Sequence, residues 1–173
     1  MSFSLRTTIR DLVAPEHQLS CSRSLWHTLL RDLARRGDSR RESGAFLLGE
    51  QRQGRRRIVR CVPYDDLDPH CLDTGVVVFD GAGYGPLWEL CRSTGLAVVA
   101  DIHTHPGAPW QSEADRKHPM IALPGHVALI VPNLAQHIVP PDALGIYEYR
   151  GDHQWQDRSG QRADQFFYVG IWG

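Results

Sequence analysis

The first regular pattern of apolar and polar positions along this chain has a helical period. Between residues 22 and 37, apolar side chains recur at the three- and four-residue spacing of one helix face, at Leu25, Trp26, Leu29, Leu30 and Leu33. Ser22 or Ser24 can cap the start of this segment, and Gly37 can end it. The pattern predicts an amphipathic helix.

Shorter apolar runs predict strands. Two are expected to form a hairpin, at 42–50 and 55–64, joined by a turn at 51–54. Five more are expected at 76–79, 96–103, 125–132, 143–149 and 165–172. The run at 96–103 is almost continuously apolar, which is typical of a strand buried on both faces.

Two further helices and one loop complete the expected elements. Residues 85–95 run from a glycine–proline pair to a glycine, and residues 112–122 begin with a serine that can cap a helix. The polar segment 65–75 is expected to be an exposed loop. The resulting order, α-β-β-β-α-β-α-β-β-β, predicts an α/β (α+β mixed) fold, a mixed sheet flanked by helices.

Length and charge narrow the class of protein. A chain of 173 residues that is 42% hydrophobic can bury one core, and no linker interrupts it, so residues 1–173 are expected to form a single domain. A net charge of −1 gives no general attraction to nucleic acid or an acidic membrane. No apolar run approaches the roughly 20 residues that span a bilayer, and the first residues lack the apolar core of a signal peptide. We therefore expect a cytoplasmic protein with neither nucleic acid nor membrane as a partner.

The four cysteines predict neither a metal site nor a redox site. Cys21, Cys61, Cys71 and Cys91 are far apart and form no C-x-x-C pair, so the sequence encodes neither a zinc knuckle nor a thioredoxin-type redox pair. They are expected to be free thiols in a reducing compartment.

The segment "DIHTHPGAPWQSEAD", residues 101–115, carries the candidate chemistry. Side chains two positions apart on a strand point to the same face, so His103 and His105 would lie side by side where Pro106 ends the strand. Neutral imidazole is a preferred zinc ligand. Such a pair alone is a weak signal, because two histidines at a strand end can equally bond to backbone or water.

Ser112 and Asp115 strengthen the metal interpretation. A serine N-cap would place Asp115, three positions later, on the same side of the first helical turn. The helix dipole would keep that carboxylate ionised, as a metal ligand must be. Two histidines and one carboxylate leave a fourth zinc position for water. The alternative is a capping box in which aspartate replaces the usual glutamate.

Glu42 is a candidate general base from elsewhere in the chain. It opens the expected strand 42–50 and is followed by the apolar run "FLLG". A glutamate in that position is more often a solvent-facing residue, so its position alone would not select it.

Three motifs together resemble a known family. E-x-x-x-F-L-L-G from Glu42, H-x-H-P from His103 and S-x-x-D from Ser112 resemble the JAMM motif of the JAB/MPN+ metalloproteases, which include zinc-dependent deubiquitinases and prokaryotic relatives. The resemblance implies a single-domain JAB/MPN fold of cytidine-deaminase-like architecture. It also implies that Zn²⁺ is bound by His103, His105 and Asp115. Glu42 would then be the general base and acid, and Ser112 the hydroxyl that stabilises the oxyanion.

The same resemblance implies a function. It suggests an isopeptidase or peptidase that cleaves after the C-terminus of a ubiquitin-like protein, in deconjugation or precursor processing, with a ubiquitin-activating-type enzyme in the same pathway. The alternative is a non-catalytic, zinc-bound MPN-type interaction module of a larger assembly. Barrel amidohydrolases and cupins also use H-x-H, but this chain is short for the first and carries too many helices for the second.

The loop between the histidines and the serine departs from the family pattern. Five residues separate Pro106 from Ser112, one fewer than usual, which puts the placement of Ser112 in question. Within that loop, Trp110 could line a groove for a narrow substrate tail or cover the core.

Overall fold

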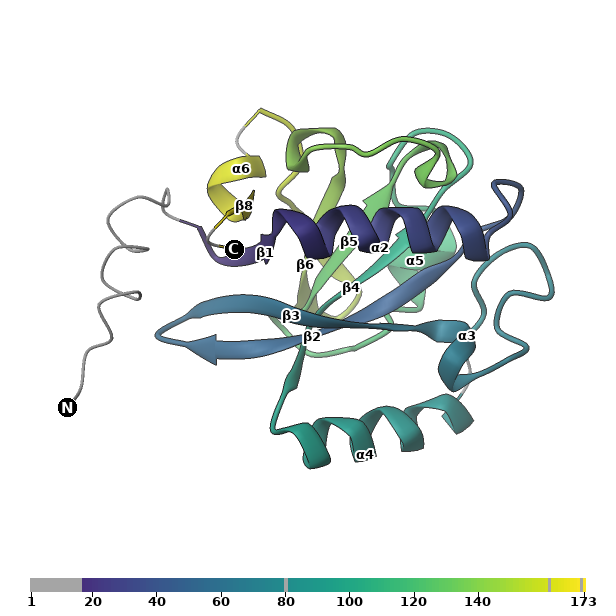
Figure 1. Ribbon diagram of the computed structural model, residues 1–173, viewed down its shortest axis with the longest axis horizontal. Coiled ribbons are helices and arrows are strands. Elements are labelled where there is room, and N and C mark those ends of the chain that lie inside the picture. Colours follow the sequence, from purple (N-terminus) through teal and green to yellow (C-terminus); the bar gives the residue numbers. More distant parts are fainter. Residues whose placement is uncertain (1–16, 80, 162, 172) are drawn as a thin grey trace.

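The computed structural model describes residues 17–79, 81–161, 163–171 and 173, and its centre is one mixed sheet (Figure 1). The order of the strands across the sheet is β7-β6-β5-β4-β2-β3-β1-β8. Their bounds are β1 Leu19–Ser22, β2 Gly44–Arg52, β3 Arg55–Pro63, β4 Ala97–Thr104, β5 Val127–Val131, β6 Gly145–Gly151, β7 Gln154–Asp157 and β8 Phe167–Gly170. The pairs β1–β3, β1–β8 and β4–β5 are parallel, and the other pairs are antiparallel. The expected mixed sheet flanked by helices is confirmed.

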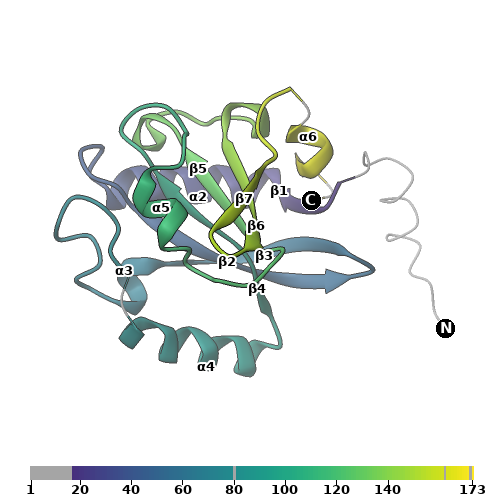
Figure 2. The same cartoon turned by 180° about the vertical axis from the view of Figure 1, so that it is seen from behind.

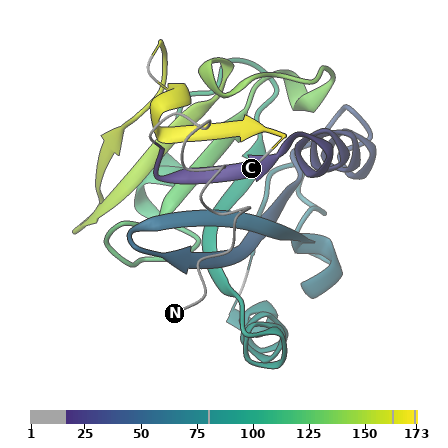
Figure 3. The same ribbon diagram turned by 60° about the vertical axis from the view of Figure 1, so that its left-hand side comes forward.

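Helices cover both faces of this sheet. The α-helices are α2 Arg23–Arg36, α3 Tyr64–Leu67, α4 Tyr84–Thr94, α5 Glu113–Lys117 and α6 Ala163–Phe166. Short 3₁₀ turns are η1 Gly81–Gly83, η2 Asn133–Ala135 and η3 Pro141–Ala143. The long helices α2 and α4 lie on opposite sides of the sheet (Figures 2 and 3).

The amphipathic helix predicted between residues 22 and 37 is confirmed as α2, and both of its predicted ends are confirmed. The Ser22 hydroxyl accepts the Leu25 N–H at 3.3 Å, so Ser22 rather than Ser24 is the N-cap of α2, and Gly37 follows its last residue. Trp26, Leu29, Leu30 and Leu33 are buried, while Leu25 is half-buried at the edge of the core.

Alternating side chains of β2 separate two apolar clusters. Ala45 and Leu47 join the cluster under α2, whereas Phe46 and Leu48 join the cluster under α4. The two-residue turn to β3 has positive φ at both Gln53 and Gly54, as a type I′ hairpin requires. The expected hairpin is confirmed, but its turn is shorter than the expected 51–54, because Gln51 and Arg52 still pair with β3.

Several sequence expectations about elements are wrong. Residues 76–79 are not a strand, and Glu42 lies two residues before β2 rather than in it. Among the described residues of the run 165–172, which are 165–171, only 167–170 form a strand, because Gln165 and Phe166 end α6. The segment 65–75 is not simply exposed, because it completes α3 and buries Cys71 and Leu72. The short strands β1 and β7 carry no strong alternation and were not expected.

Two general expectations can be compared with the described residues. No helix among them is long and apolar enough to cross a bilayer. The four cysteines are free, as expected.

Candidate metal centre

The two histidines lie where β4 ends, because His103 is its penultimate residue and His105 directly follows its last residue, Thr104. Their side chains are nearly buried, with 7% of His103 and 12% of His105 exposed, and their Nε2 atoms are 3.1 Å apart. The His105 N–H donates to the carbonyl of Val131, and the His105 carbonyl accepts from the Leu134 N–H, which fixes the backbone between the end of β4 and Pro106. The pair therefore presents two ring nitrogens to one point.

Asp115 is held by the first turn of α5. The Ser112 N–H donates to Asp115 Oδ2 at 2.7 Å, and the Asp115 N–H donates to Ser112 Oγ at 3.1 Å. This reciprocal capping box is the alternative that the sequence left open, and it is present. It also aims the carboxylate at the histidines, so capping and ligand placement are the same structure.

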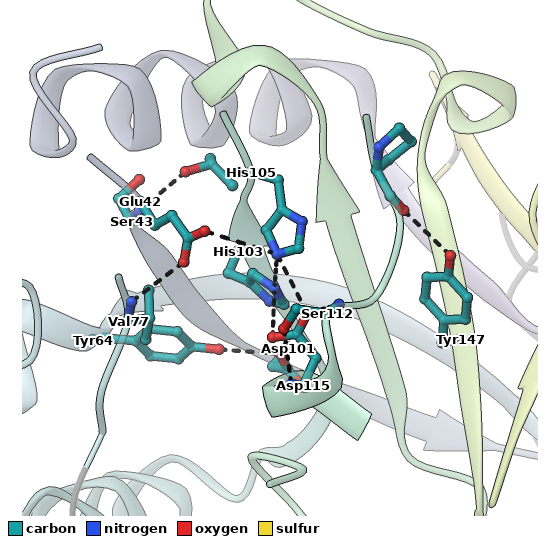
Figure 4. Close-up of polar contacts among 12 residues, drawn as sticks. Glu42, Ser43, Tyr64, Val77, Asp101, His103, His105, Ser112, Asp115 and Tyr147 are labelled. Atoms are coloured by element: carbon teal, nitrogen blue, oxygen red, sulfur yellow. Dashed lines mark hydrogen bonds and ion pairs between the residues drawn. The ribbon is translucent and has the colours of Figure 1, made fainter. Parts of the chain in front are cut away.

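The three side chains converge on one position (Figure 4). Asp115 Oδ1 is 3.5 Å from His103 Nε2, and Oδ2 is 3.3 Å from His105 Nε2. One ligand atom from each residue lies within 4.8 Å of the other two. Two imidazoles and one carboxylate are a set that zinc binds in catalytic sites, so these residues fit the metal that the sequence implies.

The protonation of the cluster also suits a cation. Burial alone would raise the pKa of Asp115, but the interactions with His103 and His105 outweigh it and hold that pKa well below its usual range. Burial alone would lower the pKa of His103, but the interactions with Asp115 raise it on balance. The lowered pKa keeps the Asp115 carboxylate ionised, as a metal ligand must be.

Glu42 reaches this cluster from a segment that precedes β2. Its N–H donates to the Gly75 carbonyl at 3.0 Å, and its Oε2 accepts from the Val77 N–H at 3.4 Å. Its Oε1 is 3.9 Å from His105 Nε2, and 16% of the side chain is exposed (Figure 4). Glu42 is thus directed into the site rather than along a solvent-facing strand edge.

Strand register explains how Glu42 comes to the histidines. Gly44 of β2 pairs with His103 of β4. The next pair continues beyond the strand, because the Thr104 N–H donates to the Ser43 carbonyl and the Ser43 N–H donates to Thr104 Oγ1. One step further along this antiparallel pair, Glu42 comes beside His105.

Ser112 lies at the edge of the cluster, beside Asp115 (Figure 4). Its oxygen accepts the Asp115 N–H, which leaves the hydroxyl proton to be donated elsewhere. Its role toward an oxyanion stays a prediction. Trp110, in the same loop, is 70% exposed and lines a pocket of about 190 Å³ with Pro109 and Tyr147, so it does not cover the core.

Sequence reasoning missed a buried polar network below the histidines. Asp101 is 1% exposed, and both of its carboxylate oxygens are hydrogen-bonded. Tyr64 Oη donates to Oδ2 at 3.1 Å, and His126 Nε2 lies 2.6 Å from Oδ1. The only sequence signal was that Asp101 precedes His103 by two positions and so shares its face of β4.

Comparison with known proteins identifies the family. The model of the prokaryotic homologs of the JAB domain matches residues 23–140, which is more than half of the chain and includes all of the cluster. The chain belongs to this family. Its JAB domain therefore holds the two histidines, the aspartate and Glu42 within the matched residues.

Solved structures agree on the fold. Protein DSY2949 from Desulfitobacterium hafniense, a solution structure, is 18% identical with a TM-score of 0.62, over 87% of this chain and 92% of that one. A protein from Salinibacter ruber, also a solution structure, is 18% identical with a TM-score of 0.52, over 82% of this chain and 89% of that one. At this identity the likeness supports the JAB fold alone.

Proposed function

We propose that this JAB-domain protein is a zinc-dependent isopeptidase or peptidase. It hydrolyses the amide bond after the C-terminus of a ubiquitin-like protein, either to release a conjugate or to process a precursor. One observation carries the proposal: a carboxylate outside the ligand set, that of Glu42, is held by Val77 and directed at the cluster of His103, His105 and Asp115.

The positions of the side chains suggest the role of each one in the proposed reaction. When bound by His103, His105 and Asp115, zinc would lower the pKa of a water molecule and polarise the scissile carbonyl. Glu42 accepts the proton of the attacking water and delivers it to the leaving nitrogen. Such general acid–base catalysis contributes roughly 10² to 10⁴-fold. The hydroxyl of Ser112, whose oxygen is occupied by the Asp115 N–H, donates its proton to the developing oxyanion.

The surface around the site supports a protein substrate. Val76 and Val78, on either side of the residue that holds Glu42, are 51% and 55% exposed, and Trp110 is 70% exposed. Exposed apolar side chains near a site are typical of surfaces that bind a protein chain. A ubiquitin-like protein offers such a surface beside a narrow C-terminal tail, and its conjugates would come from an activating-type enzyme in the same pathway.

The second candidate is a zinc-bound interaction module without catalysis. A structural zinc site is normally closed by four protein ligands. Here the convergent set offers three, with Glu42 beside it. This arrangement favours the enzyme over the module.

The test uses the whole chain and a ubiquitin-like protein fused through its C-terminus to a reporter. We expect cleavage after the last residue of the ubiquitin-like protein, loss of cleavage with a zinc chelator, and recovery when zinc is restored. A fusion that ends in a different sequence is the control. Stoichiometric zinc without cleavage of any such fusion would favour the interaction module instead.

A further inference from the structure

A buried polar network lies on the same sheet face as the metal cluster and belongs to neither the ligands nor the base. It consists of Tyr64, Asp101 and His126, whose exposed fractions are 0%, 1% and 6%. Figure 4 shows the Tyr64 hydroxyl directed at Asp101, near the two histidines. Because Asp101 and His103 are two positions apart on β4, both side chains leave the strand on one face.

The network joins three segments that must be aligned for the site to form. Tyr64 follows the last residue of β3, Asp101 lies within β4, and His126 directly precedes β5. Asp101 uses one oxygen for each partner, Tyr64 at 3.1 Å and His126 at 2.6 Å. A single carboxylate therefore fixes β4, the ligand-bearing strand, relative to the segments on both sides of it.

Tyr64 also contacts the strand that follows Glu42. A Cβ placed on Gly44 would lie 2.3 Å from Tyr64 Cε2, so the tyrosine ring fills the space above Gly44. Gly44 pairs with His103 across the β2–β4 ladder and is two residues from Glu42. The ring thus rests on the backbone that carries the base, while its hydroxyl holds the strand that carries the ligands.

Stability alone does not account for such a network. Burying a charged carboxylate is costly unless it is fully bonded, and apolar residues of similar volume are often as stable or more so. Burial raises the pKa of Tyr64 well above its usual value, so its hydroxyl keeps the proton that it donates to Asp101. What the polar contacts supply is a fixed direction and separation between two strands.

We propose that Tyr64, Asp101 and His126 are positioning residues that set the metal ligands of β4 and hold Glu42 at a fixed distance from them. The inference rests on the proposed function, but its main test does not need a substrate. Mutation of residues that orient metal ligands commonly lowers metal affinity or activity by about 10–100-fold.

The first experiment measures zinc affinity in Asp101→Asn, which keeps the shape of the side chain and removes its charge. We expect the dissociation constant for zinc to rise about 10–100-fold. The matched control is Tyr84→Phe, because the Tyr84 hydroxyl donates its hydrogen bond to the Met120 carbonyl rather than to Asp101. In that variant zinc affinity should stay at the wild-type value.

The second experiment separates the base from the ligands with Tyr64→Phe, which keeps the ring and removes the hydroxyl. We expect kcat to fall about tenfold with unchanged KM, while zinc affinity changes less than in Asp101→Asn. The proposal is overturned if Asp101→Asn binds zinc as tightly as wild type, even when its melting temperature falls, because the network would then be structural only. If the wild-type protein cleaves no fusion, the zinc affinity of Asp101→Asn still tests the positioning role.

Discussion

At the scale of single residues, Ser112 combines two tasks in one hydroxyl. Its oxygen caps α5 by accepting the Asp115 N–H, and its proton remains for the oxyanion of the proposed reaction. Any change at Ser112 therefore affects both the helix cap and the proposed oxyanion contact, and an experiment has to separate them.

Ser112→Ala is expected to lower kcat by about 10² to 10³-fold, because removing one oxyanion donor costs roughly 2.7–4 kcal/mol. Loss of the cap costs about 1 kcal/mol of stability in addition. Ser22→Ala is the matched control, since Ser22 caps α2 in the same way. Steady-state kinetics and denaturation measure both effects. If Ser112→Ala slows cleavage no more than Ser22→Ala does, Ser112 is a cap only.

Among residues, the convergence of the three candidate metal ligands could be predicted best from the sequence. His103, His105 and Asp115 follow from local geometry, namely two strand positions and one helical turn, and the structure brings them together. Glu42 needed the family resemblance, because its approach to His105 depends on the register of two strands far apart in sequence.

At the scale of elements, the start of β2 is the most constrained segment near the site. A Cβ on Gly44 would approach Tyr64 Cε2 to 2.3 Å and the Ile102 carbonyl oxygen to 2.6 Å. Both neighbours are fixed, one by its bond to Asp101 and the other by the β4 backbone. Only a residue without a side chain fits.

Gly44→Ala should therefore destabilise the fold by about 1–3 kcal/mol, the usual cost of overpacking. Gly85→Ala is the control, because a Cβ on this helical glycine would meet nothing within 4 Å, and alanine there should be neutral or slightly stabilising. Chemical denaturation compares the two. Equal stability of Gly44→Ala and wild type would contradict the close contact with Tyr64.

Elements with strong periodicity could be predicted, and weaker ones could not. The amphipathic α2 and the apolar β4 were predicted because their own side chains define the buried face. The apolar run 76–79 predicts a strand, but the Val77 N–H donates to the Glu42 side chain rather than to a neighbouring strand. The polar edge strand β7 was missed because three of its four residues are exposed.

At the scale of the whole molecule, protons would compete with a bound metal for the cluster of His103, His105 and Asp115. Burial opposes both shifts, but the interaction between the two groups lowers the pKa of Asp115 and raises the pKa of His103. The raised pKa of His103 stabilises the metal-free fold below the ordinary histidine value of about 6.5, and this contribution is lost as pH rises through the raised pKa. Zinc binding requires the unprotonated imidazole, so its contribution to stability increases as pH rises.

The stabilisation by zinc should consequently grow with pH. Between about pH 5.5 and pH 8, the melting temperature with zinc minus that without it is expected to rise as the His103 imidazole loses its proton. Thermal unfolding at fixed zinc concentration measures this difference, and His103→Ala is the control, with little shift at any pH. A zinc shift that is independent of pH would contradict binding through His103.

Long-range packing marks the limit of what the sequence could predict for the molecule as a whole. The mixed sheet flanked by helices followed from the order of elements, and the family match agrees with it. The Tyr64–Asp101–His126 network did not follow from the sequence. Tyr64 and Asp101 are 37 positions apart, Asp101 and His126 are 25 apart, and none of the three belongs to a local pattern.

The central claim is that Glu42 is the base of a zinc peptidase, and Glu42→Gln tests it most directly. Glutamine keeps the size of the side chain but cannot take a proton. With zinc content and cleavage of the ubiquitin-like fusion measured on the same samples, we expect one zinc per chain in both proteins and a fall in kcat of roughly 10² to 10⁴-fold in the variant. Zinc-loaded Glu42→Gln that cleaves at the wild-type rate would contradict the account.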